Sequence, residues 1–398
     1  MSNAHTAAGA ERSVLPAGTP LPSALPAGTP LPAMRTAERA DRLRALFDSA
    51  GCDALLVTNL ANIRYLTGFS GSAALLLIAR SGGLFVTDGR YRTQSADELS
   101  AAGVDIERLV PETMAGQRSG LADAVNALGE GARLGLEAGS VTWADARRYE
   151  SEWFAHSSLV ATDGLVEQLR LVKDEEERAR LAAAAAIADA ALAATLPMLH
   201  ERPTELAFAR ALERAMFERG AEALSFATIV ASGANGALPH HHPGDRRVEP
   251  GELVVIDFGA MVDGYHSDMT RTVCVGPPKD ATAARMVEVV AEAQAAGVAA
   301  VQAGASAGEV DAACRTIISA AGWGEAFVHS TGHGVGLDIH EDPRVGAGST
   351  FELAAGHVVT VEPGVYLEGF AGVRIEDTLF VDESGASVLT HHPKTLVV

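Results

Sequence analysis

The chain has 398 residues, more than one hydrophobic core normally holds, so we expect two domains. Its formal net charge is -20, from 51 acidic and 31 basic residues, and the absence of any Lys or Arg run argues against a nucleic-acid partner. Three widely spaced cysteines without a CxxC pair indicate a reducing compartment. No apolar run near the N-terminus is long enough to cross a membrane, so we expect a cytoplasmic protein that does not associate with membranes.

The first segment, residues 1–33, has a biased composition. It contains the sequence LPAGTPLP twice and is rich in Pro, Ala, Gly and Thr. Such a segment cannot bury enough apolar surface to fold, which predicts a disordered tail. A helix-like stretch begins at Met34, with Leu43, Leu46 and Phe47 at helical spacing, so we expect the folded protein to begin there.

Residues 34–168 are predicted to form an α/β domain. Short apolar runs separated by Gly and Asp are typical of strands, and helical segments lie between them. These runs are ALLVT from Ala54, SAALLLIA from Ser72, GLFVTD from Gly83 and RLGLE from Arg133. The charge-rich stretch LRLVKDEEE, residues 169–177, leads into a long Ala-rich helix and marks the expected domain boundary.

The second half, residues 169–398, combines long helices with hairpins. Helices are predicted over residues 205–219 and 282–302, and the sequence SAGE from Ser306 is a capping box that introduces another. Residues 253–275 and 357–381 each read as an apolar segment, a turn and a second apolar segment, which is typical of an antiparallel hairpin.

The first hairpin carries two acids inside apolar strands. Asp257 and Asp268 are symmetric about Val262 and Asp263, beside an Asp-Gly turn. Strand pairing about that centre would place the two carboxylates nearly opposite each other.

The second hairpin repeats this arrangement, with Glu362 and Glu376 symmetric about Gly369. Acids gathered in an apolar sheet repel one another unless a strong positive charge holds them, so the pattern predicts bound divalent metal ions. The segment HSTGHGVG offers His333 as a further ligand, and its glycines would let the backbone approach a crowded site. Oxygen ligands with one nitrogen favour Mn, Fe, Co or Zn over calcium.

Each feature alone has a simpler interpretation. A single Asp in a strand is more often an edge or turn residue, and a single His is more often structural. The GHGVG run lacks the GxGxxG spacing of a dinucleotide site, HEDPR has no second His, and no GxSxG nucleophile motif occurs. Only the combination of paired acids therefore points to a metal centre.

The segments IDFGAMVDGYHSDMTRT, HSTGHGVGLDIHE, TVEPGVY and GVRIEDT occur in this order and resemble the metal-binding segments of the pita-bread metallopeptidases (M24). That family includes aminopeptidase P, prolidase, methionine aminopeptidase and the metal-free creatinase. The segments NLANIRYLTGFSGS and FVTDGRY resemble the creatinase-type N-terminal domain. The resemblance runs from about Met34 to near the C-terminus. It implies an α/β (α+β) fold, in which a creatinase-type α/β domain precedes a pita-bread catalytic domain over residues 169–398.

The resemblance also implies roles for individual side chains. It implies that two divalent ions are bound by Asp257, Asp268, His333, Glu362 and Glu376. Of these ligands, Asp268 and Glu376 are implied to bridge the two ions. The implied catalytic residues are His240, Glu362, His329 and His340, and the implied substrate-binding residues are His329, His340, Arg374 and Tyr366. His241 and His242 leave the register of His240 open. Mn²⁺ is the expected ion, with Co²⁺, Fe²⁺ and Zn²⁺ as alternatives.

These residues imply an aminopeptidase that hydrolyses the Xaa-Pro bond at the N-terminus of peptides, with an Xaa-Pro dipeptidase (prolidase) as the alternative. A metal-free creatinase-like hydrolase or a non-catalytic binding module of the same fold would not need all five ligands. Methionine aminopeptidase would not need the first domain. The expected partners are peptide or dipeptide substrates and further copies of the chain, as a homodimer or higher homo-oligomer.

Overall fold

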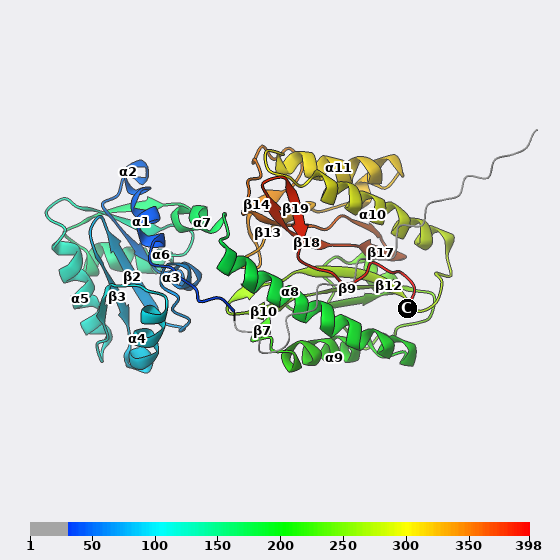
Figure 1. The fold of residues 1–398 in the computed structure, drawn as a ribbon, viewed down its shortest axis with the longest axis horizontal. Helices are drawn as coiled ribbons and strands as arrows, with labels where there is room; N and C mark the ends of the chain where they lie inside the picture. Colours follow the sequence, from blue (N-terminus) through cyan, green and yellow to red (C-terminus); the bar gives the residue numbers. More distant parts are fainter. Residues whose placement is uncertain (1–30) are drawn as a thin grey trace, which may run out of the picture.

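The computed structural model describes residues 31–398, which form two lobes joined through α7 (Leu165–Arg170) (Figure 1). The predicted boundary after residue 168 falls within this helix and stays a prediction. Of the predicted tail, only residues 31–33 are described, and the other thirty lie outside the described part of the chain. The Pro32 carbonyl accepts a hydrogen bond of 3.1 Å from Arg180.

We expect a chain that starts at Met34 to keep its kcat/KM and its melting temperature. The truncation removes one described contact, the bond from Arg180 to Pro32, while Arg180 keeps its ion pair with Asp263 at 2.5 Å. A chain that starts at Gly51 is the control and should lose both, because it lacks the fully buried Leu43 and Phe47. Activity and thermal melting are compared with the full chain, and a large loss in the Met34 variant would show that the tail is structural.

The N-terminal lobe is a six-stranded sheet in the order β4-β3-β2-β1-β5-β6, with helices packed around it. The strands are β1 (Ala54–Val57), β2 (Ala74–Ala79), β3 (Gly83–Thr87), β4 (Glu107–Leu109), β5 (Arg133–Glu137) and β6 (Ser158–Thr162). The helices are α1 (Arg39–Arg44), α2 (Phe47–Ala50), α3 (Leu60–Thr67), α4 (Arg92–Ala101), α5 (Met114–Asn126) and α6 (Trp143–Arg148). All four predicted strands are confirmed. The predicted helix begins at Arg39 rather than Met34, because the Thr36 amide bonds to the Ala102 carbonyl instead.

In the C-terminal lobe, residues 171–398, two layers of helices enclose the sheets: α8 and α9 lie on one side, and α10 and α11 on the other (Figure 1). The helices are α8 (Glu175–Thr195), α9 (Glu205–Glu218), α10 (Ala281–Ala300) and α11 (Ala307–Ala320). The strands are β7 (Ala223–Leu224), β8 (Ile229–Ser232), β9 (Leu253–Phe258), β10 (Ala260–Val262), β11 (Tyr265–His266), β12 (Met269–Cys274), β13 (Gly332–Gly334), β14 (Glu341–Val345), β15 (Val358–Val361), β16 (Gly364–Leu367), β17 (Ala371–Arg374), β18 (Asp377–Asp382) and β19 (Gly385–Val388). The predicted capping box at Ser306 is present at the start of α11.

The helical segment Glu175–Glu201 is long and apolar enough, by length and composition, to cross a membrane. Half of its most apolar window is buried inside the lobe. Ala184, Ala188 and Ala191 on α8 are fully buried. We therefore interpret α8 as a core helix, since core helices meet the same length and composition criteria.

The two predicted hairpins are present, and the register of each one determines where its acidic residues lie. In the first, Asp257 pairs with Thr270, so Asp268 lies diagonally from Asp257 rather than opposite it. The cause is the turn, which is centred on Asp263 and Gly264, both with positive φ (47° and 77°), one position later than predicted. Positive φ at both central residues is the type I′ geometry of a tight hairpin.

In the second hairpin, the register agrees with the sequence symmetry. Val361 pairs with Asp377, and Gly364 pairs with Arg374. Glu362 and Glu376 lie between these pairs, where β15 passes into β16 and β17 passes into β18. The two glutamates therefore face each other at the junction of two sheets.

The lobes share one hydrophobic cluster. It contains Phe69 and Phe85 of the N-terminal lobe together with Tyr265, Val335 and Val358 of the C-terminal lobe. Polar contacts run beside it: Arg170 pairs with Glu341 at 2.5 Å, and Lys173 pairs with the same carboxylate at 2.7 Å. The two lobes are thus packed against each other as one body.

Candidate active site

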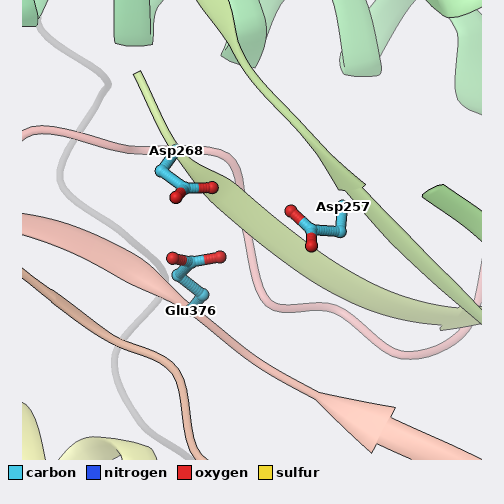
Figure 2. A group of neighbouring side chains, drawn as sticks. All are labelled: Asp257, Asp268 and Glu376. Atoms are coloured by element: carbon cyan, nitrogen blue, oxygen red, sulfur yellow. The ribbon is translucent and has the colours of Figure 1, made fainter. Parts of the chain in front are cut away.

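Three carboxylates converge from the two hairpins. Asp257 comes from β9, Asp268 precedes β12, and Glu376 precedes β18, and their side chains point toward one another (Figure 2). One oxygen from each lies within 4.8 Å of the others. This is a spacing at which carboxylate oxygens can share a metal ion.

His333 and Glu362 complete the predicted ligand set. The Nε2 atom of His333 lies 3.5 Å from Asp268 and 3.4 Å from Glu362. Its Nδ1 atom lies 2.9 Å from the Gly334 carbonyl, which requires the proton on Nδ1 and leaves the Nε2 lone pair free to bind a metal. The structure therefore brings all five predicted ligands together, although their roles as ligands stay a prediction.

The donor set fits divalent cations by two observations. Among the described residues, Asp257 Oδ1 and Glu376 Oε1 are buried without a hydrogen-bond partner. Burial raises the pKa of Asp268 and Glu376 well above the usual range, with repulsion between the neighbouring carboxylates adding to it. Burial likewise raises the pKa of Glu362 to about 8. A cluster of this kind is stable in its charged form only beside strong positive charge.

The glycines of the His333 segment let the backbones meet. A Cβ atom on Gly332 would lie 2.0 Å from the Thr360 carbonyl oxygen, and one on Gly334 would lie 2.2 Å from the Asp342 carbonyl oxygen. No larger residue fits at either position, as the sequence predicted for a crowded site. Threonine hydroxyls then hold the acids: Thr270 donates to Glu376 at 2.7 Å.

Arg374 is a buried cation at the edge of the carboxylate cluster. It donates to Asp257 at 2.6 Å and to the Tyr366 hydroxyl at 2.7 Å. Burial opposes its charge, but Tyr366 and Asp257 hold its pKa well above the usual value. Tyr366 in turn lies 2.9 Å from Nε2 of His329, whose Nδ1 faces the Ser330 carbonyl at 2.8 Å. Arg374, Tyr366 and His329 thus form one hydrogen-bonded chain, and burial lowers the pKa of His329 to about 4.

A cavity of about 770 Å³ opens beside the cluster. His240, His329 and His340 line it together with all five predicted ligands. The His340 ring packs against His333, with centroids 4.4 Å apart and planes at 71°. Residues of α7 also reach the cavity, so the N-terminal lobe's junction helix contributes to its wall.

The structure separates the three consecutive histidines. His241 Nε2 lies 2.9 Å from the carboxylate of Glu205, at the start of α9. His240 lies close enough to His329 and His340 for its charge to lower the pKa of both, after the larger effect of burial. His240, His241 and His242 all line the cavity, so the substrate-side role of His240 stays a prediction.

Arg344 and Glu341 are among the cavity residues that were not singled out in the sequence. Arg344 on β14 is exposed and lines the cavity, and no carboxylate of the described residues lies within ion-pair distance of it. Glu341 lines the same cavity and is held by Arg170 and Lys173; burial opposes its charge, but the two cations lower its pKa to about 2. Both residues follow His340 in HEDPR, a segment considered in the sequence only as an incomplete metal motif.

A two-lobed fold in which four acids and one histidine converge is the architecture of a dinuclear metallohydrolase. The chain belongs to Metallopeptidase family M24, a family of dinuclear metal-dependent hydrolases, whose sequence profile matches residues 179–383. Residues 39–172 match the Creatinase/Prolidase N-terminal domain. These matches confirm the predicted family and fold class.

Relatives with known structures or curated names carry two activities. The Xaa-Pro dipeptidase of Pyrococcus furiosus is 35% identical, over 90% of this chain and 99% of the relative. The structure of an Xaa-Pro dipeptidase from Bacillus anthracis is 39% identical with a TM-score of 0.85, covering 91% of this chain and 99% of that one. The structure of an X-Pro aminopeptidase from Thermotoga maritima is 37% identical with a TM-score of 0.81, covering 90% and 100%.

Proposed function

We propose that the protein is an Xaa-Pro dipeptidase that works with two divalent metal ions, Mn²⁺ being the expected ion. The converging set of five ligand side chains beside the cavity carries this proposal. The curated and solved relatives named as Xaa-Pro dipeptidases favour the dipeptidase over the aminopeptidase that we put first from the sequence. The aminopeptidase is the second candidate, supported by the Thermotoga maritima structure.

Arg344 supports the choice of a dipeptide. A dipeptide of the form Xaa-Pro has a free carboxylate next to the proline ring, whereas a longer peptide has another amide there. Arg344 offers an exposed guanidinium on the cavity wall for such a carboxylate. In a longer peptide this cation would have no charged partner at that position.

Bound metal ions would supply a water molecule that loses its proton near neutral pH. Side chains of the protein would transfer the protons and stabilise the negative charge that develops. Glu362, which lies 3.4 Å from His333 beside the cavity, would take up a proton and pass it to the leaving proline nitrogen. His240 and His340 would donate to the carbonyl oxygen as it gains negative charge. The hydrogen bonds from Arg374 to Tyr366 and from Tyr366 to His329 hold His329 in place at the cavity wall.

We expect kcat/KM for Ala-Pro to exceed that for Ala-Pro-Ala and for Ala-Ala at least tenfold, about 1.4 kcal/mol for each comparison. A tertiary Xaa-Pro amide has no N–H, so a site shaped for the ring gains apolar contact while a general peptidase site loses a hydrogen bond. The three peptides are assayed at identical Mn²⁺ loading. Preference for Ala-Pro-Ala would establish the aminopeptidase instead, and equal rates on Ala-Ala would contradict the proline specificity.

A charge-removing variant tests the role of Arg344. Arg344→Gln should lower kcat/KM for Ala-Pro about 10–100-fold, because a hydrogen bond between charged groups is lost. It should have little effect on Ala-Pro amide, which lacks the carboxylate. Equal losses on both substrates would remove Arg344 from carboxylate recognition.

Cytoplasmic location and assembly as a homodimer or higher oligomer remain proposals. The three cysteines Cys52, Cys274 and Cys314 are buried and free, which fits a reducing compartment.

A further inference from the structure

A fully buried carboxylate lies behind the histidine loop of the cavity. Glu205 is the first residue of α9, and its side chain is 0% exposed. Within the described structure it has no lysine or arginine partner within ion-pair distance. A buried carboxylate of this kind is retained only where several donors satisfy it.

Donors from one loop surround this carboxylate. Oε1 of Glu205 accepts from the amide and the hydroxyl of Ser232, both at 2.7 Å, and from Asn235 at 3.0 Å. Oε2 accepts from His241 at 2.9 Å and from the Gly244 amide at 3.3 Å. Both ends and the middle of the loop 232–244 therefore converge on one side chain.

The same loop carries His240 into the cavity. The backbone at Gly236 contacts β17 so closely that a Cβ on Gly372 would lie 1.8 Å from the Gly236 carbonyl oxygen. The Pro239 carbonyl accepts a bond of 3.4 Å from Arg374. The loop is therefore held on one side by β17 and on the other by Glu205, and His240 follows directly after Pro239.

We infer that Glu205 and His241 form a positioning pair, which fixes the loop 232–244 so that His240 faces the substrate carbonyl. His241 contributes to the reaction through its bond to Glu205, and His240 contacts the substrate. This inference rests on the proposed hydrolase activity for the role of His240. The contacts of Glu205 themselves do not depend on the substrate.

The chemistry of the side chain makes this inference testable. A carboxylate only accepts hydrogen bonds, and all of the groups around Glu205 donate to it. A glutamine of the same size would turn one acceptor into an NH₂ group facing His241 and Gly244, or facing Ser232 after a flip of the amide. Glu205→Gln therefore removes hydrogen bonds between the loop 232–244 and this side chain without creating a cavity.

We expect Glu205→Gln to lower kcat about 10–100-fold, with KM within about threefold of the wild-type value and metal content unchanged. A purely structural role would instead leave the kcat of the folded fraction unaltered. Glu218→Gln on the same helix is the matched control, since Glu218 is exposed and has no hydrogen bond in the described structure, and it should match the wild type. Wild-type kcat in Glu205→Gln, or loss of metal in proportion to activity, would overturn the inference.

A second pair of variants tests His241 and does not require Glu205→Gln to fold. His241→Gln keeps an N–H donor for Glu205, whereas His241→Leu removes it. We expect His241→Gln to have at least tenfold higher kcat than His241→Leu. Equal inactivity of both would show that the imidazole itself is needed and would overturn the positioning role. All rates are measured on the peptide that the wild type cleaves best, so failure of the Xaa-Pro specificity leaves this test intact.

Discussion

Replacing Asp268 with asparagine is expected to lower kcat/KM for Ala-Pro more than about 100-fold and to leave the protein with less than its full complement of metal. Asp268 lies with Asp257 and Glu376 in the carboxylate group and 3.5 Å from His333. A neutral amide binds a divalent cation more weakly than a carboxylate does. Even residues outside the ligand set of a metal site cost about 10–100-fold when replaced, so a ligand shared by two ions should cost more.

Metal content by elemental analysis and kcat/KM are measured on the same preparation. Burial and the repulsion of the neighbouring carboxylates raise the pKa of Asp268 well above its usual range in the metal-free protein, so a neutral asparagine removes no favourable charge there. The asparagine variant should therefore melt at the temperature of the metal-free wild type, which separates loss of metal from misfolding. Asp123→Asn, at an exposed position, is the matched control. Full metal occupancy with wild-type turnover in Asp268→Asn would contradict the metal-binding role.

Replacing Arg271 with methionine is expected to lower the free energy of unfolding by about 3–5 kcal/mol. Arg271 is 2% exposed and pairs with the buried Asp377 at 3.0 Å. It also donates to the His392 carbonyl at 2.9 and 2.7 Å, which ties the C-terminal segment to β12. Methionine fills similar space but leaves Asp377 without its arginine and the carbonyls without donors.

The measurement is the urea midpoint and slope of the metal-free protein, so that metal binding does not contribute. Arg214→Met is the control, because Arg214 is an exposed residue of α9 without an ion pair in the described structure. The control should shift the free energy of unfolding by less than about 0.5 kcal/mol. A shift of that size in Arg271→Met would show that the buried pair does not stabilise the fold.

The hairpins show how far local pattern predicts structure. Apolar strands around an Asp-Gly turn are a strong local signal, and both hairpins were predicted. The register of the first was wrong by one position, because Asp263 as well as Gly264 adopts positive φ and so occupies the turn. Asp257 and Asp268 still share a face, since diagonal neighbours on paired strands point to the same side.

The candidate site likewise contains residues that local sequence patterns identify and residues that they do not. Acids in apolar strands and a glycine-rich histidine segment can be recognised along the sequence, so the five candidate ligands could be named. Glu205 could not be identified from the sequence. Its hydrogen-bond donors lie 27 to 39 residues away along the chain, and nothing in the sequence of its helix indicates that it is buried. Arg344 could not be identified from the sequence either, because its proposed role depends on the cavity that it lines.

The hydrophobic cluster shared by the lobes limits how freely either can be exchanged. Phe69 and Phe85 on one side and Tyr265 and Val358 on the other complete a single interior, so a lobe made alone would present that face to water. Because this cluster spans both halves of the sequence, we expect the two lobes to unfold in one transition. A chimera that borrows its first lobe from a relative would have to borrow the matching face of the second lobe as well. The two lobes of this protein are therefore a fitted pair rather than interchangeable modules.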